Sequence, residues 1–162
     1  MRVYHGSLEK VVNPSLDKMN PRTDFGSGFY TTTNYDQAVR WTLVKQRRSN
    51  NFNSKRYVNV FEYNENNSLN VLKFEDANDK WIDFICKNRK SDELIHDYDV
   101  VIGPVANDNL YTVLAGYENG LYDKEETVKR LKTYLLSDQI SFHNYEALKY
   151  LKYVETIEVG EE

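Results

Sequence analysis

The sequence predicts an α+β fold in one domain, and two observations support this prediction. Segments rich in β-branched and aromatic residues are mixed with segments of helical periodicity, but the two kinds do not alternate as they do in α/β proteins. The 162 residues also show no repeat, low-complexity tract or linker that divides them. A chain of this length can bury a sizeable core, so one domain is expected over residues 1–162.

The first elements lead towards a glycine-rich turn. Residues 2–4 predict a short strand that runs into His5-Gly6-Ser7, where small residues leave backbone and hydroxyl groups open. Val11-Val12 favours a second strand, which Asn13-Pro14 ends. Asn20-Pro21 marks a further turn.

The stretch from 23 to 41 is predicted to organise the fold, because it changes from turn to strand to helix. Gly26 and Gly28 permit positive φ or a close backbone approach, and residues 29–33 have the aromatic and β-branched chemistry of a strand. Asn34 or Asp36 then caps a helix that runs to about residue 48. A tight turn is therefore expected to direct this strand towards whatever lies beside it.

The middle of the chain predicts a hairpin, a helix and a buried strand. Residues 57–63 alternate well and residues 69–74 return after a polar turn, so a hairpin is the economical interpretation. Asp76 or Asn78 caps a helix that ends near Arg89. The run from Asp99 to Val105 has the composition of a buried strand.

The C-terminal third continues the same mixture. Helices are predicted over residues 110–117, 123–136 and 145–153, with a strand over 139–143 between the last two. Residues 156–159 are expected to close the fold as an edge strand.

Composition limits the possible function classes. A net charge of -4 favours neither a nucleic-acid nor a membrane surface, and no stretch approaches the ~20 apolar residues that a membrane span needs. Cys86 is the single cysteine, so no internal disulfide forms, and its apolar surroundings predict an inert buried thiol. His96 and His143 have no Cys or carboxylate at ligand spacing, so no metal site is expected. The chain is predicted to be soluble and cytoplasmic.

Three segments resemble the motifs of the diphtheria-toxin-like ADP-ribosyltransferases, a superfamily that includes the poly(ADP-ribose) polymerases. Val3-Tyr4-His5-Gly6-Ser7 resembles the first motif. Gly26-Ser27-Gly28-Phe29-Tyr30, followed by Gln37-Ala38, resembles the second. Ser137-Asp138-Gln139-Ile140-Ser141-Phe142 resembles the third, except that Gln139 stands where that family has its catalytic Glu. The resemblance implies split antiparallel β-sheets around a cleft, with flanking helices.

A closer resemblance covers nearly the whole chain. It is similar to an uncharacterised bacterial family with ADP-ribosyltransferase-like features, in which stretches like those from Asp24 to Tyr30 and from Tyr98 to Asn109 recur with the pair Asp138-Gln139. Small antitoxin-like genes neighbour members of that family. The resemblance therefore implies a bacterial or phage toxin or effector, with an antitoxin protein as a possible partner.

The resemblance also implies a site for NAD as substrate. His5 would hydrogen-bond the adenine-side ribose, with Ser7 as a second ribose contact. The Gly6 backbone would hold the nicotinamide amide, and Tyr30 would stack on the nicotinamide ring. His5, Tyr30 and Gln139 would form the catalytic set. The remaining contacts with NAD would come from Gly28, Phe29 and Gln37.

Gln139 leaves the activity open. Its carbonyl accepts a hydrogen bond, but a neutral amide cannot act as a general base, which makes polymer extension unexpected. Three options remain: mono-transfer to a protein or nucleic-acid acceptor, NAD hydrolysis, or a fold that only binds NAD, ADP-ribose or a partner protein. His5 and Tyr30 also have a purely structural interpretation, and the 13 tyrosines could serve core and assembly only. A basic cluster is either a solvated face or a grip for the NAD pyrophosphate or a nucleic acid: Lys45, Arg47, Arg48, Lys55 and Arg56.

Overall fold

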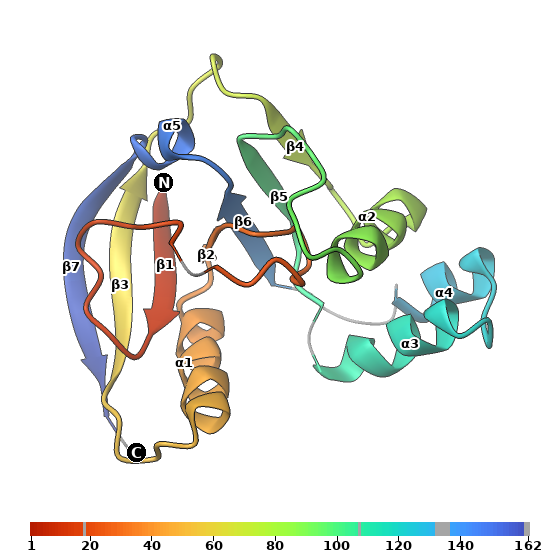
Figure 1. Cartoon of the computed structure of the whole chain (residues 1–162), viewed down its shortest axis with the longest axis horizontal. Coiled ribbons are helices and arrows are strands. Elements are labelled where there is room, and N and C mark those ends of the chain that lie inside the picture. The colour runs from red at the N-terminus through yellow and green to blue at the C-terminus, as the bar shows by residue number, and fades with distance from the viewer. Residues whose placement is uncertain (18, 107, 132–136, 161–162) are drawn as a thin grey trace.

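Two β-sheets with helices around them make up the molecule, so the predicted α+β class is confirmed (Figure 1). The computed structural model describes residues 1–160 except 18, 107 and 132–136. The first sheet is antiparallel and has the strand order β1-β3-β7: β1 (Arg2–Ser7), β3 (Arg56–Tyr63) and β7 (Leu151–Val159). The second sheet has the strand order β2-β6-β5-β4: β2 (Phe29–Thr31), β6 (Asp138–Phe142), β5 (Val100–Pro104) and β4 (Val71–Lys73).

A single bridge joins the edges of the two sheets in the described part of the chain. The backbone of Tyr4 in β1 exchanges hydrogen bonds of 2.8 and 3.0 Å with Thr32, just after β2. Beyond that bridge β1 and β2 separate. A hydrophobic cluster fills the space between the sheets with residues of both, including Val3, Phe61 and Phe142. A second cluster covers the other face of the second sheet, where Trp81 and Ile85 pack near Val101.

Helices lie on the outer faces of the sheets (Figure 1). Two of them begin where the sequence predicts, because Asn34 and Asn78 accept capping hydrogen bonds from Gln37 and Trp81. α1 packs on β1 and β3, whereas α2, α3 and α4 contact one another beside the second sheet. The helices are α1 (Tyr35–Ser49), α2 (Asp79–Arg89), α3 (Asp108–Glu118), α4 (Lys124–Leu131) and α5 (Tyr145–Leu148).

The predicted hairpin over 57–63 and 69–74 is wrong. β4 runs parallel to β5 in the second sheet, and its partner strand is not β3. Asp99, just before β5, explains the pairing: its carboxylate accepts from the Asn70 N–H at 2.7 Å and its N–H donates to the Asn70 carbonyl at 2.9 Å. These bonds align the start of both strands, so the polar turn after β3 connects two sheets.

The helix predicted over 145–153 is also wrong, because it stops after one turn. Asn144 caps that turn by accepting from the Ala147 N–H at 2.9 Å. Leu151–Val159 then pairs antiparallel with β3, so the expected edge strand is only the end of β7. Ala147, Leu148 and Leu151 have helical spacing, but the β-branched residues that follow favour a strand.

Other expectations have mixed outcomes. Val11-Val12 forms no strand. The helix predicted to reach residue 136 is observed to Leu131, and its remainder lies outside the described residues. Cys86 is buried as expected, and burial raises the pKa of its thiol to about 12. Among the described helices, none combines the length and the apolar composition needed to cross a membrane.

Candidate functional site

Three distant segments meet where the sheets diverge. The His5 ring at Nδ1 lies 2.7 Å from the carbonyl oxygen of Tyr30, which links β1 to β2. Tyr30 is in turn the register partner of Ser141 in β6, two residues after Gln139. The backbones that carry His5, Tyr30 and Gln139 are therefore neighbours, although their side chains do not all face the same way.

The His5 ring is oriented so that its Nε2 atom is left as a hydrogen-bond acceptor. Because a carbonyl oxygen only accepts, the ring carries its proton on Nδ1 and donates to Tyr30. The ring stacks on Phe29 with centroids 4.1 Å apart. Burial, with a smaller contribution from the Lys45 ammonium, lowers the pKa of His5 to about 3. The ring is thus neutral, and its Nε2 accepts no hydrogen bond from the described part of the chain.

Gly6 and Ser7 lie at the end of β1. Like Tyr4, Gly6 directs its backbone groups away from β3, because alternate residues of an antiparallel strand face opposite edges. The Gly6 carbonyl accepts from Lys45 Nζ at 2.5 Å, and burial lowers the pKa of that amine to about 8. A side chain at position 6 would collide with the Ala38 carbonyl. The Ser7 hydroxyl accepts from the Glu9 N–H at 3.2 Å.

Tyr30 points to the face of the second sheet opposite Phe29, beneath residues 23–28, which we call the covering loop. Its hydroxyl lies 2.7 Å from the Gly26 carbonyl and accepts from the Phe25 N–H at 2.9 Å. Its ring is stacked 6.4 Å from the Phe25 ring. Burial raises the pKa of Tyr30, so the hydroxyl stays protonated. The stacking surface of Tyr30 is occupied by the covering loop in this conformation.

Gln139 belongs to a buried polar network. Its Nε2 donates to Asp24 Oδ2 at 3.0 Å and to the Pro104 carbonyl at 3.3 Å. Asp24 Oδ1 accepts from Arg89 Nε and Nη2 at 2.9 and 2.7 Å. Gln139 is 3% exposed, and its Oε1 accepts no hydrogen bond from any described residue. The network joins the covering loop to α2 and β6.

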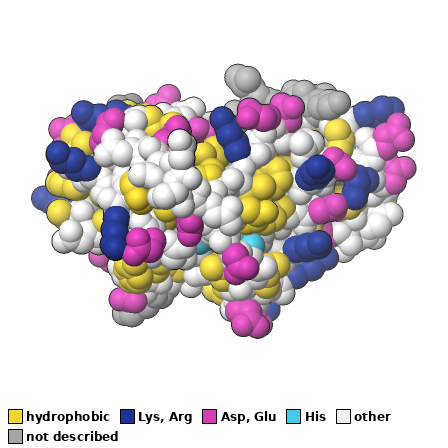
Figure 2. All heavy atoms as spheres, turned by 90° about the horizontal axis from the view of Figure 1, so that it is seen from above, with side chains coloured by type: hydrophobic (Ala, Val, Ile, Leu, Met, Phe, Trp, Pro, Cys, Tyr) yellow, Lys and Arg dark blue, Asp and Glu magenta, His cyan; other side chains and the backbone are white. Residues whose placement is uncertain are grey.

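Two further histidines hold the covering loop. His143 lies 2.8 Å from the Ser27 carbonyl through Nδ1 and 2.7 Å from the Ser141 hydroxyl through Nε2. Burial lowers the pKa of His143 to about 4. His96 lies 2.7 Å from the Phe25 carbonyl. The described residues contain no group of three His, Cys, Asp or Glu side chains that could hold a metal ion. Histidine side chains reach the surface in an indentation between the two halves of the molecule (Figure 2).

The remaining implied contacts have structural partners. A Cβ on Gly28 would lie 2.8 Å from the Phe142 carbonyl oxygen, so a close backbone approach requires glycine there. Phe29 is buried between the sheets. Gln37 is buried on α1 and accepts from Arg40 Nη2 at 2.9 Å. Gly28, Phe29 and Gln37 therefore shape the structure around the site through their contacts with other parts of the protein.

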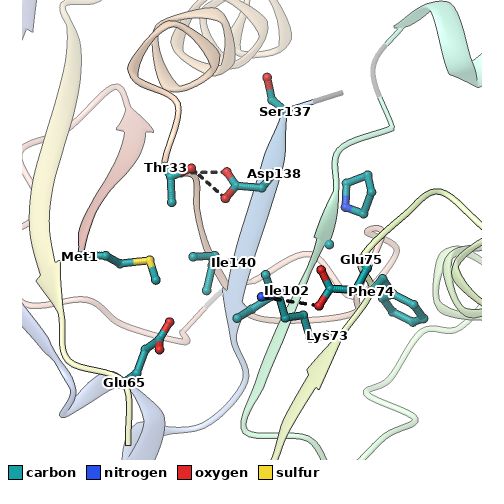
Figure 3. A pocket seen from close by; sticks show the side chains of 12 residues that line it. Met1, Thr33, Glu65, Lys73, Phe74, Glu75, Ile102, Ser137, Asp138 and Ile140 are labelled. Carbon is teal, nitrogen blue, oxygen red and sulfur yellow. Dashed lines mark hydrogen bonds and ion pairs between the residues drawn. The ribbon is translucent and has the colours of Figure 1, made fainter. Parts of the chain in front are cut away.

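A separate groove of about 280 Å³ lies on the opposite face of β6 (Figure 3). It includes Asp138, whose carboxylate accepts from the Thr33 N–H at 2.9 Å and from its hydroxyl at 2.7 Å. Asp138 therefore points away from Gln139, as strand alternation predicts. His5, Tyr30 and Gln139 do not line this groove. The cleft that the resemblance implies is not open beside Tyr30 and Gln139, because Phe25 and Asp24 pack against these two side chains.

Sequence reasoning missed Asp24, Arg89 and the two clamping histidines, His96 and His143. Asp24 lies two residues before the Gly26-Ser27-Gly28 turn, and its charge inside an otherwise uncharged stretch was the available signal. Arg89 is 65 positions further along the chain, and no local pattern connects it to Asp24.

Comparison with known proteins gives one finding. A protein-family model described as "Protein of unknown function (DUF3990)" matches residues 1–153. No curated protein and no solved structure matches the chain.

Proposed function

The chain belongs to the DUF3990 family, whose function is unknown, and we propose from its geometry that it is an NAD-dependent mono-ADP-ribosyltransferase. The supporting observation is the meeting of His5, Tyr30 and Gln139 backbones at the divergence of β1 and β2. His5 and Tyr30 are 25 residues apart, and Gln139 lies more than a hundred residues further along the chain. A toxin or effector that modifies a protein or nucleic acid fits this proposal, with an antitoxin protein as a possible partner.

Two acceptors that have no partner among the described residues support a site for ribose. His5 Nε2 and Gln139 Oε1 each belong to a side chain that is anchored through its other polar end. Ribose hydroxyl groups are donors that can satisfy such acceptors. In the proposal, His5 accepts from the adenine-side ribose and Gln139 accepts from the 2'-hydroxyl of the nicotinamide-side ribose. The Gly6 N–H holds the nicotinamide amide, since the Gly6 carbonyl already accepts from Lys45 Nζ.

The chemistry proposed is cleavage of the glycosidic bond to nicotinamide, with transfer of ADP-ribose to an acceptor. The bond between nicotinamide nitrogen and ribose C1' breaks, nicotinamide leaves with the electron pair, and positive charge develops on the ribose. The acceptor then forms a bond to C1' and releases its proton. Gln139 stabilises the cation through its carbonyl dipole but cannot take that proton, so the acceptor or water supplies the base. A modest rate and single transfers are therefore expected.

The covering loop must move for NAD to bind as proposed. Nicotinamide on Tyr30 takes the place that the Phe25 ring holds, 6.4 Å from the Tyr30 ring. Gly26 adopts a positive φ of 88° within this loop, and such a conformation needs glycine.

Labelled NAD tests this proposal. Incubation with bacterial extract should label an acceptor and release nicotinamide, and calorimetry should detect NAD binding. His5→Asn keeps a donor for the Tyr30 carbonyl but loses Nε2, so it should abolish transfer without unfolding the protein. Phe52→Ala, at a side chain that is 64% exposed on a distant loop, is the control. Absence of transfer, nicotinamide release and NAD binding in the wild-type protein would refute the proposal.

A non-catalytic module that binds NAD, ADP-ribose or a partner protein is the second candidate. It is favoured by Gln139, because a neutral amide cannot act as a general base. NAD binding without nicotinamide release under any acceptor condition supports this candidate over the enzyme.

A further inference from the structure

A buried carboxylate stands directly beside the position that departs from the transferase pattern. Asp24 is 9% exposed and Gln139 is 3% exposed, and their side chains meet at 3.0 Å. Arg89 approaches the other oxygen of Asp24 through two nitrogens, at 2.7 and 2.9 Å. Three segments distant in sequence thus place one carboxylate, one guanidinium and one amide in contact.

This contact fixes the orientation of the Gln139 amide. A glutamine side chain has a donor end and an acceptor end. Asp24 Oδ2 and the Pro104 carbonyl, which both accept, face the same end of Gln139. Nε2 must therefore point to them, because the flipped amide would bring its oxygen against two acceptors in a buried place. Oε1 is consequently directed away from Asp24.

We propose that Asp24, held by Arg89, is a positioning residue that fixes Gln139 with Oε1 presented to the ribose of NAD. This inference rests on the proposed function. It also explains why position 139 carries Gln: the negative charge of the site lies on the covering loop, and a donor is required opposite it. Gln139 is then matched to Asp24 and is not a damaged form of the Glu that the transferase pattern places there.

The pairing predicts opposite effects for two substitutions. Gln139→Glu alone sets two carboxylates about 3 Å apart, and only one Arg89 serves them, so the folded protein must retain a proton on the pair. Asp24→Asn alone presents an Nδ2 donor to Gln139 Nε2, so Gln139 either loses the bond that anchors it or turns its oxygen inward and gives up the bond to the Pro104 carbonyl. Both outcomes disturb the outward acceptor. In the double variant the new amide at position 24 donates to one oxygen of the carboxylate at position 139, and the second oxygen of that carboxylate points outward.

Four proteins test the inference: wild type, Gln139→Glu, Asp24→Asn and the double variant. At pH 7 Gln139→Glu should melt roughly 5 °C or more below wild type, and the double variant should recover at least half of that loss. The loss should shrink at pH 5, where a protonated Glu can again donate to Asp24. Gln37→Glu is the thermal control, since the same change beside the Arg40 guanidinium adds no like charge.

NAD binding gives the second readout. Asp24→Asn should weaken NAD binding on the order of 3- to 10-fold, the effect of one lost hydrogen bond, and the double variant should restore it. Gln139→Glu melting like wild type at pH 7, or a double variant with neither its stability nor its NAD affinity restored, would overturn the inference. If the wild-type protein binds no NAD but the melting temperatures still show the coupling between positions 24 and 139, the proposed function and the contact of Gln139 with ribose are overturned. The pairing of Asp24 with Gln139 would then stand as a structural result.

Discussion

Removal of the Arg89 guanidinium should destabilise the fold strongly. Arg89→Met leaves the Asp24 carboxylate buried without that cation, and both side chains are shielded, at 16% and 11% exposed. Breaking a buried ion pair from one side costs about 3 to 5 kcal/mol, because the remaining charge is desolvated and uncompensated. For a chain of this size that cost corresponds to a melting temperature lower by roughly 6 to 20 °C.

Arg22 supplies the matched control. It pairs with Asp92 at 2.7 Å, the same distance as the Arg89 pair, but the two side chains are 57% and 80% exposed. Arg22→Met should therefore change the melting temperature by less than about 2 °C. Thermal unfolding followed by circular dichroism compares the two variants. If Arg89→Met costs no more than Arg22→Met, burial does not govern this network and the reasoning about Asp24 fails.

Three other predictions concern the covering loop. Gly28→Ala should cost about 2 kcal/mol, because its Cβ would lie 2.8 Å from a backbone oxygen, whereas Gly160→Ala, with nothing within 4 Å, should be neutral in chemical denaturation. The pKa of His143 is lowered from 6.5 to about 4 in the folded state. The stability contributed by its neutral ring is therefore complete above pH 6.5 and is lost as the pH falls towards 4. In His143→Asn, a pH series should show a melting temperature that depends less on pH. Tyr30→Phe keeps the ring but removes the hydroxyl that holds Phe25 and Gly26, so calorimetry should show tighter NAD binding in a less stable protein.

Elements with local determinants could be predicted from the sequence. Asn34 and Asn78 sit before helices because their side chains satisfy free N–H groups within three residues, and no distant partner is needed. β3 was equally clear, because its β-branched and aromatic residues are typical of a strand and lie within the strand itself. The pairing of β4 with β5 could not be predicted, since it depends on the hydrogen bond between Asn70 and Asp99, which are 29 positions apart. β7 was missed because its first apolar residues continue the spacing of the preceding helical turn.

The candidate site divides in the same way. Its strand positions could be predicted, because motifs at His5, Tyr30 and Gln139 are local. The residues that cover these positions could not be predicted, since Asp24 and Gln139 are separated by 115 positions and meet only through the tertiary fold. A motif identifies which residues approach a site, but the surrounding charges decide how those residues act.

Under the proposed function, the covering loop connects the stability of the protein to its affinity for NAD. Five side chains form hydrogen bonds with this loop: Tyr30, Gln139, Arg89, His96 and His143. Each such hydrogen bond contributes about 1 kcal/mol net to the stability of the closed loop. A ligand that requires the loop to open binds with an apparent dissociation constant equal to the intrinsic one divided by the open fraction. An opening cost of about 3 kcal/mol weakens binding roughly 100-fold. Weak NAD binding by the isolated protein would thus measure the loop as well as the site, and Tyr30→Phe separates the two because it loosens the loop while keeping the stacking surface.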